Sequence, residues 1–368
     1  MSTMIVFICI ILVFIVVTLL FLNFYPPFGG NPSKEKLRQY RNSPNFRKNT
    51  FLYPEPTKSF EPRLKNVTSL LRDYMKGNPK VKPDKSIPMD YLDLHDLDGQ
   101  TRPTITWFGH SALLLQIEGT KILLDPMLGH YASPVQKFGS KRYSKELPFE
   151  LEQLSTIDAV VLSHDHYDHL DYGTIMKLKD KVTQFIVPLG VGIHLERWGI
   201  DPKRISEHDW WDEYEFQGLK FACTPSRHFS GRSLFNGGST LWCSWVIEAK
   251  ETKVFFSGDS GYGPHFEQIG DKYGPFDLTL MECGQYDARW SNIHMMPEES
   301  VQAHMDVKGQ VMIPIHWSAF TLALHDWTDP IERVTLAAKK RDVHISTPKI
   351  GETVLIGSNE YPSSIWWK

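Results

Sequence analysis

Apolar side chains are distributed unevenly along this 368-residue chain, and its first segment contains almost nothing else. Residues 5–24 carry no charged side chain and consist mainly of Ile, Leu, Val and Phe. A helix that crosses the hydrocarbon core of a bilayer needs about 20 such residues. Summed over this run, the insertion free energy reaches about −5 kcal/mol. The pattern therefore predicts an uncleaved transmembrane anchor at residues 4–25.

Two other interpretations of this segment are weaker. A cleaved signal peptide has basic residues before its apolar run and small residues at the cleavage site, whereas here no Lys or Arg precedes the run and Tyr25-Pro26-Pro27 follows it. A helix in the core of a soluble domain is usually shorter.

Residues 31–50 hold six basic side chains against the single acid Glu35. By the positive-inside rule, this excess indicates a single-pass anchor with the body on the cytoplasmic side of the membrane.

The amino-acid composition of the chain changes again near residue 100. Residues 26–100 are rich in Pro, Asn, Lys and Arg, which is typical of a basic linker and a wrapping extension, with one short helix at 64–75. From residue 104 onward, short β-rich runs alternate with turns. The predicted strands lie at 104–108, 113–117, 121–124, 159–162, 185–188, 219–222, 241–248, 253–256, 278–281 and 311–315, and the predicted helices at 174–179 and 297–306.

These elements indicate the class of fold. Strands and helices mix without the strict alternation of a doubly wound sheet, which favours an α/β fold of two mixed sheets flanked by helices, at residues 101–368. The net charge of −3 gives no reason to expect a nucleic-acid partner. The four cysteines show no CxxC spacing, which excludes a disulfide framework as the organising device.

A dense cluster of polar side chains directly follows one apolar strand. The strand at 159–162 leads into His164, His166, Asp168 and His169, a His-x-His-x-Asp-His pattern. Past a strand, such a loop can direct its first two histidines one way and the other two side chains another, an arrangement that suits two adjacent ions. Imidazole and carboxylate ligands suit zinc, and manganese or iron stay compatible. The alternative is a His-rich surface loop, or a capping Asp with incidental histidines.

Four side chains cannot complete two metal sites, so we expect further ligands at later strand ends. His228 follows the strand at 219–222, Asp259 follows the strand at 253–256, and His316 follows the strand at 311–315. Each of them alone is as often a turn or capping residue. Their joint occurrence downstream of the cluster is the stronger signal.

The seven positions, in this order, resemble the metallo-β-lactamase superfamily. The likeness is greatest to its N-acyl-phosphatidylethanolamine-hydrolysing phospholipase D branch, over residues 106–351. The shared stretches include Trp107-Phe-Gly-His110, Asp125-Pro126, Ala132-Ser-Pro-Val-Gln136, Gly139-Ser-Lys-Arg142, Val187-Pro-Leu-Gly190, Asp209-Trp-Trp211, Gly258-Asp-Ser-Gly-Tyr262, Gly274-Pro-Phe-Asp277, Arg289-Trp290 and Ile315-His-Trp317.

The resemblance implies an αββα sandwich with two zinc ions at one edge of the sheets. One ion would be held by His164, His166 and His228, the other by Asp168, His169 and His316, and Asp259 would bridge them. A water or hydroxide shared by the ions would attack phosphorus, leaving phosphatidic acid and an alcohol such as an N-acylethanolamine. Asp168 or Asp259 would accept the proton.

Supporting roles are expected for six further residues. Asp125 could orient a ligand histidine through a hydrogen bond, or simply form a turn before Pro126. His110 could act in the same way, or be a core histidine with a structural role. Four residues are expected to contact a lipid headgroup, because the resemblance brings their segments near the site and Arg and His suit phosphate oxygens: Gln136, Tyr286, Arg289 and His294.

The sequence therefore predicts a membrane-anchored dinuclear zinc hydrolase of the phospholipase D type, with phospholipid and membrane as partners. A lactonase or another hydrolase of the same superfamily is the alternative. The charge and the anchor disfavour a nuclease, and the complete ligand set disfavours a scaffold or sensor without catalysis. The oligomeric state stays open and is compatible with a homodimer.

Overall fold

Two mixed β-sheets form the body of the protein. The computed structural model describes residues 2–57, 59, 64–93, 100–233 and 236–368, so residues 58, 60–63 and 94–99 of the predicted extension lie outside the described residues. In the first sheet the strands run in the order β10 (Ile205–His208), β9 (Val182–Pro188), β8 (Ile157–Val161), β5 (Thr120–Leu124), β4 (Leu113–Ile117), β3 (Thr104–Trp107) and β18 (Thr353–Leu355). In the second the order is β11 (Glu213–Phe216), β12 (Leu219–Thr224), β13 (Ser244–Glu248), β14 (Lys253–Phe256), β15 (Phe276–Glu282), β16 (Gly309–Ile315) and β17 (His344–Ile345).

The two sheets pack against each other through alternate side chains of their strands. In β4, Leu113 and Leu115 belong to the core that both sheets share. Leu114, between them, belongs to a second core on the outer face of the first sheet. Because successive side chains of a strand point to opposite faces, a strand buried on both faces is apolar throughout. This explains the apolar runs Leu113–Leu115 and Ile122–Leu124.

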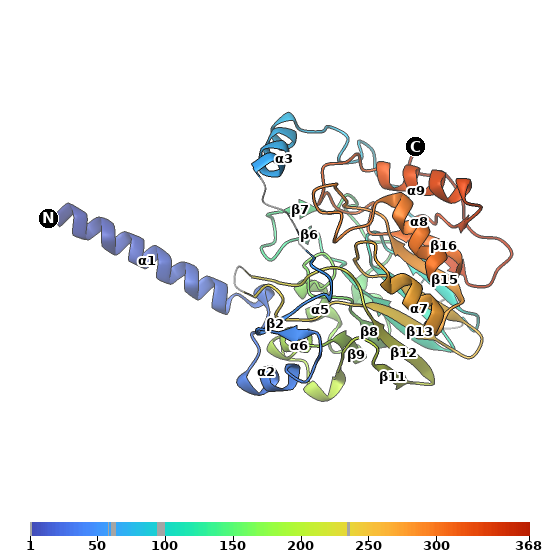
Figure 1. Ribbon diagram of the computed structural model, residues 1–368, viewed down its shortest axis with the longest axis horizontal. Coiled ribbons are helices and arrows are strands. Elements are labelled where there is room, and N and C mark those ends of the chain that lie inside the picture. The colour runs from blue at the N-terminus through green and yellow to red at the C-terminus, as the bar shows by residue number, and fades with distance from the viewer. Residues whose placement is uncertain (1, 58, 60–63, 94–99, 234–235) are drawn as a thin grey trace.

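Helices cover the outer face of each sheet. On the first sheet, α5 (Tyr172–Leu178) and α6 (Gly192–Arg197) bury Ile175 and Leu195 in the outer core. On the second, α8 (Pro297–Asp306) packs against β15 and β16, flanked by α7 (His265–Tyr273) and α9 (Asp329–Lys340) (Figure 1). The predicted αββα sandwich of two mixed sheets flanked by helices is confirmed.

The N-terminal helix stands apart from this body. Helix α1 (Ser2–Phe24) projects away from the sheets (Figure 1). Most of its apolar side chains are exposed, such as Met4 at 62% and Phe24 at 72%. Among the described residues, Thr3–Phe24 is the one helix whose length and composition suffice to cross a membrane, a property that membrane anchors and signal sequences share. After it come a short 3-10 helix, η1 (Pro26–Phe28), and α2 (Lys34–Tyr40), then a hairpin of β1 (Phe46–Arg47) and β2 (Thr50–Phe51), and α3 (Leu64–Lys76). A second hairpin, of β6 (Tyr131–Ala132) and β7 (Ser140–Lys141), lies within the main domain.

Most predicted strands and helices agree with the structure, and two differences have physical causes. The predicted helix at 297–306 coincides with α8. The strand predicted at 241–248 begins only at Ser244, because the N–H groups of Leu241 and Cys243 donate to carbonyls of Leu189 and Ser163 in loops of the first sheet. The sequence pattern does not predict β10 and β11, since these edge strands carry polar, half-exposed residues.

Candidate metal centre

Ligand-type side chains gather at one edge of the two sheets, where strands end. The loop of His164 and His166 follows β8, Asp259 follows β14 by three residues, and His316 directly follows β16. Strands β14, β15 and β16 are parallel neighbours. The carboxyl ends of parallel strands meet at one edge of a sheet, which is where α/β folds place their ligands. The topology therefore gathers residues that are far apart in the sequence.

Three imidazoles form the first group of this centre. His166 Nδ1 lies 2.9 Å from His164 Nε2 and 3.2 Å from His228 Nε2. The other ring nitrogens of His164 and His228 also have partners. His164 Nδ1 lies 2.8 Å from Ser163 Oγ, and His228 Nδ1 donates to the Ile293 carbonyl at 2.9 Å. Burial lowers the pKa of His164 and His228 well below the usual histidine value, and neighbouring histidines act in the same direction. Neutral imidazoles with converging nitrogens can ligate a metal ion.

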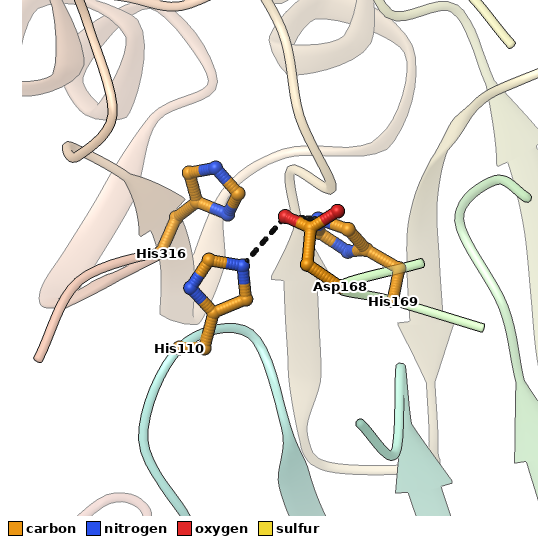
Figure 2. Close-up of side chains that lie close together, drawn as sticks. All are labelled: His110, Asp168, His169 and His316. Atoms are coloured by element: carbon orange, nitrogen blue, oxygen red, sulfur yellow. Dashed lines mark hydrogen bonds and ion pairs between the residues drawn. The ribbon is translucent and has the colours of Figure 1, made fainter. Parts of the chain in front are cut away.

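A second group, drawn in Figure 2, lies beside the first, since the ring centroids of His164 and His169 are 4.2 Å apart. It consists of His110, Asp168, His169 and His316, whose ligand atoms all lie within 4.8 Å of one another. His110 Nε2 is 2.8 Å from Asp168 Oδ2. Burial lowers the pKa of His169, but the carboxylates of Asp259, Asp168 and Asp125 outweigh burial and hold this pKa well above its usual value. An imidazole surrounded by three carboxylates marks a site that attracts a cation.

Asp259 lies between the two groups. Its Oδ2 is 3.1 Å from His169 Nε2 and 3.8 Å from both His164 Nε2 and His228 Nε2, and its Oδ1 is 3.1 Å from His316 Nδ1. Burial raises the pKa of Asp259 to about 6, although His169 opposes this shift. One carboxylate thus faces histidines of both groups, as a bridging ligand must.

Unpartnered buried atoms provide a test of whether these residues fit metal ions. Eight polar atoms of the described side chains are buried without a hydrogen-bond partner, and two of them, His169 Nε2 and Asp259 Oδ1, belong to the candidate ligands. Leaving such an atom unpartnered destabilises a fold by about 1–3 kcal/mol, so two of them in one cluster require an explanation. Metal coordination satisfies ring nitrogens and carboxylate oxygens of this kind, and zinc, manganese and iron all accept this donor set. The residues fit metal ions.

Asp125 and His110 support this centre from outside. Asp125, after β5, accepts a hydrogen bond from the Ser163 backbone N–H at 2.7 Å, and its Oδ2 lies 2.6 Å from His169 Nδ1. The backbone of His110 exchanges hydrogen bonds with the loop after β16, since its N–H donates to Trp317 O and its carbonyl accepts from His316 N–H, both at 2.9 Å. Both residues lie where the sequence places supporting roles, and His110 additionally contacts Asp168.

Glu282 is a further part of the centre that sequence reasoning missed. It is the last residue of β15, is fully buried, and accepts hydrogen bonds from the N–H groups of Ser260 at 2.9 Å and Met295 at 3.1 Å. Its other oxygen lies 3.0 Å from His294 Nδ1. The signal was an acidic residue at the end of an apolar strand, at the same sheet edge as Asp259. Glu282 fixes the loop after Asp259 and the orientation of His294.

A cavity of about 380 Å³ opens onto both groups. Its inner wall includes candidate metal ligands of both groups, namely His166, Asp168, His228, Asp259 and His316. Its outer wall contains the partly exposed apolar side chains Phe229 and Leu322 together with Trp290. This volume is within the range of small-molecule sites. A polar floor and an apolar rim suit a substrate that carries both a charged group and an apolar group.

The four expected headgroup contacts lie in three separate places. His294 lines the metal cavity. Gln136 is exposed and lines a different depression beside His130. Tyr286 and Arg289 line a larger groove of about 1450 Å³ next to α3. The Tyr286 hydroxyl donates to Asp329, and Arg289 is held by carboxylates of Asp287 and Asp73, at 2.7 Å and 3.0 Å.

Comparisons with known proteins agree with this geometry. Residues 120–317 match the family described as the beta-lactamase superfamily domain. An uncharacterized protein of Mycobacterium tuberculosis is 39% identical over 316 residues, which cover 85% of this chain and 84% of that protein. The N-acyl-phosphatidylethanolamine-hydrolyzing phospholipase D 1 of Caenorhabditis elegans is 32% identical over 282 residues, covering 72% of this chain and 79% of that protein. Igni18, a metallo hydrolase of the archaeon Ignicoccus hospitalis, shares the fold, with a TM-score of 0.53, 23% identity, and coverage of 70% of this chain and 100% of Igni18.

Proposed function

Because this chain belongs to the beta-lactamase superfamily and is a metal-dependent hydrolase, we propose that it is a membrane-anchored phosphodiesterase of the phospholipase D type. Its substrate is N-acyl-phosphatidylethanolamine or a related phospholipid, and its products are phosphatidic acid and an alcohol. The observation that carries the proposal is Asp259, which lies between two groups of ligand-type residues on the floor of a cavity with an apolar rim. The Caenorhabditis elegans relative, named for this activity, supports it.

The proposal assigns a role to each residue of the two groups. His164, His166 and His228 would hold one zinc ion, and Asp168, His169 and His316 would hold the other, with Asp259 available to both. When bound, two such ions lower the pKa of a water molecule to about 7 and stabilise negative charge on phosphoryl oxygens. Manganese or iron would serve in the same positions.

The surrounding side chains orient this set and act on the substrate. Asp125 accepts the Nδ1 proton of His169, which leaves His169 Nε2 free to bind a metal. His110 holds the Asp168 carboxylate in place. Asp168 and Asp259 are the carboxylates close enough to the centre to accept the proton of the attacking water. His294, held by Glu282, contacts a phosphate oxygen in the cavity.

An amphipathic helix with its apolar face turned outward supports a lipid substrate. On α3, the side chains of Leu64, Val67, Leu71, Tyr74 and Met75 share one face, and each is 44–79% exposed. The opposite face approaches the body, where Arg289 Nη1 lies 3.0 Å from Asp73 Oδ2. A surface helix of a soluble protein has the reverse arrangement. Figure 1 shows α3 at the end of the body from which α1 projects.

The charges and the neighbours of α3 agree with a membrane surface. Lys65, Arg72 and Lys76 flank its apolar face, as in helices that lie in an anionic lipid interface. Arg289, which fastens α3, is followed directly by Trp290 in the wall of the metal cavity. Lipid in contact with the apolar face of α3 would therefore lie near the mouth of this cavity. In this arrangement α1 spans the bilayer and the body is cytoplasmic, as the basic residues after α1 indicate.

The experiment that tests the function uses the full-length, zinc-loaded protein in mixed micelles. We expect release of phosphatidic acid from N-acyl-phosphatidylethanolamine. Asp259→Asn should lower this rate by about 10²–10⁴-fold, the range of a lost acid–base group. Asp271→Asn, at an exposed carboxylate on α7, is the matched control and should retain the wild-type rate. Turnover of lactones or esters alone would replace the proposal by the lactonase alternative.

A further inference from the structure

The segment that joins α1 to the body, residues 26–30, is bonded into the domain instead of passing over it. Residues 27–30 are buried. The Gly30 N–H donates to His194 Nδ1 at 3.0 Å, and the Arg197 guanidinium donates to Gly29 O at 2.6 Å. Arg232 donates to Pro27 O through both Nε and Nη2, at 3.0 and 2.8 Å. This junction segment therefore supplies acceptors and a donor to side chains that lie within the hydrolase domain.

Two of these side chains also hold the loop of candidate ligands. Arg232 Nη1 donates to the carbonyl of Asp165 at 2.6 Å and to that of Leu170 at 2.8 Å. His194 Nε2 lies 3.2 Å from Asp165 Oδ2. Asp165 stands between His164 and His166. Arg232 and His194 thus contact the junction segment on one side and the ligand loop on the other.

Burial makes these contacts difficult to replace. Arg232 is 2% exposed and His194 and Asp165 are fully buried. The Arg232 guanidinium also lies over the Tyr167 ring, with its centre 4.2 Å from the ring centroid. A buried cation that loses its acceptors is strongly destabilised unless it moves. If the junction segment left, Arg232 would have to reorient, and the loop that it holds would lose its support.

Close packing at two glycines shows that the contact is specific. A Cβ atom on Gly29 would lie 2.0 Å from His194 Nδ1, and Gly29 has a φ of +75°, a conformation that other residues rarely adopt. A Cβ atom on Gly30 would lie 2.5 Å from the Ile193 carbonyl oxygen. A free linker would need neither glycine.

We propose that the junction segment positions the metal-binding loop: residues 26–30 hold His194 and Arg232, and these two positioning residues hold residues 164–170 in the geometry that binds metal. The strength of metal binding then depends on how the apolar helix joins the domain, so this helix contributes more than attachment. The inference rests on the assignment of His164 and His166 as ligands in the proposed function.

The test measures metal binding by full-length protein in detergent, without any lipid substrate. Gly29→Ala displaces the junction segment without altering the ligand loop, and Arg197→Ala, at an exposed side chain, removes its bond to Gly29 more gently. Gly237→Ala, where an added Cβ atom meets nothing within 4 Å, and Lys203→Ala, at an exposed lysine, are the matched controls. Zn²⁺ affinity is measured by chelator competition, and ligand geometry from the visible spectrum of the Co²⁺ form.

We expect Gly29→Ala to weaken Zn²⁺ binding at least tenfold and Arg197→Ala to weaken it by a smaller factor, both with an altered Co²⁺ spectrum. Both controls should match the wild type. Thermal unfolding of the metal-free proteins separates this effect from a general loss of stability. Wild-type affinity and spectrum in both Gly29→Ala and Arg197→Ala would overturn the inference and leave the proposed function intact. Failure of the wild type itself to bind Zn²⁺ would overturn both.

Discussion

The carboxylate of Asp125 and the imidazole of His169 lie 2.6 Å apart, Oδ2 to Nδ1, and both side chains are fully buried. This contact joins the end of β5 to the loop after β8, in adjacent parallel strands of the first sheet. Because the carboxylate accepts the Nδ1 proton, Nε2 is the nitrogen that carries the lone pair whenever the His169 ring is neutral, and it lies 3.1 Å from Asp259 Oδ2. One hydrogen bond thus decides which nitrogen of His169 can bind a metal.

Asp125→Asn tests this relationship at nearly constant size. The amide is a weaker acceptor and can present its NH₂ group to His169, so the imidazole loses its fixed tautomer. We expect a loss of metal affinity of about 10–100-fold, the usual effect of removing such a partner. Isothermal titration of the metal-free protein with Zn²⁺ measures it, with Asp180→Asn at an exposed position as the control. Equal affinities in the two variants would contradict the assigned role.

Metal removal should lower the stability of the whole domain. The two groups of buried histidines and carboxylates are held together at short distances. A ligand present at 1,000 times its dissociation constant stabilises the folded state by about 4 kcal/mol. In a chain of this size, this corresponds to a fall in Tm of about 5 °C after chelation. Scanning calorimetry before and after dialysis against a chelator, with Zn²⁺ added back, is the measurement, and an unchanged Tm would contradict bound metal.

His294→Ala should impair turnover without releasing metal. The His294 side chain lines the cavity and is held by Glu282 at 3.0 Å, but it is outside the proposed ligand set. We expect kcat/KM to fall by about 10–100-fold, since a hydrogen bond to a charged group contributes about 1.5–3 kcal/mol. Metal content by atomic absorption should stay at the wild-type level. His344→Ala, at an exposed histidine in β17, is the control, and loss of a metal ion from the His294→Ala variant would make His294 a ligand instead.

The outward face of α3 should determine activity on bilayers. Leu71→Glu places a charge where we propose contact with lipid, and the side chain is 56% exposed in the protein itself. Burial of one such side chain contributes about 1.5–3 kcal/mol, so hydrolysis of phospholipid in vesicles should fall about tenfold. Hydrolysis of a short-chain, monomeric substrate should not change.

Leu336→Glu provides the matched control for this experiment. Leu336 is 53% exposed on α9, a helix that we do not assign to the membrane surface. Its variant should behave as the wild type in both assays. An equal fall of vesicle hydrolysis in the two variants would show that added charge alone causes the effect.

Acid should destabilise the domain through His304. Burial lowers the pKa of His304 to about 4, and its Nδ1 lies 2.7 Å from Thr279 Oγ1. In the unfolded chain, His304 takes up a proton near pH 6.5, whereas in the folded protein it does so only near pH 4. Its contribution to the unfolding free energy is therefore fully present above pH 6.5 and is lost as the pH falls from 6.5 to 4. The loss reaches about 3 kcal/mol.

His304→Asn isolates this contribution. Asn retains a polar atom near Thr279 but does not titrate, so its variant should lose less unfolding free energy between pH 7 and pH 4.5 than the wild type. Urea titrations of the metal-free proteins at both pH values measure the difference. His344→Asn, at an exposed site, should retain the full pH dependence. Identical pH dependence in wild type and His304→Asn would exclude His304 as the source.

Much of the fold could be predicted because its strands are apolar and short. The runs at 113–117 and 121–124 and the helix at 297–306 coincide, within a residue, with β4, β5 and α8. The outward orientation of α3 could not be predicted in this way. Its pattern predicts an amphipathic helix, but contacts with distant residues, such as the ion pair between Asp73 and Arg289, 216 residues apart, decide which face meets the body.

The sequence by itself determined the cluster at residues 164–169 and the strand ends that carry His228, Asp259 and His316, because metal chemistry selects residue types and strands place them at one edge. Only the tertiary structure decided which side chains support that cluster. Glu282 beside His294 and Arg232 between Pro27 and Asp165 depend on contacts between distant segments. Such contacts leave no local pattern, since a buried polar side chain is stable wherever the fold supplies its partner.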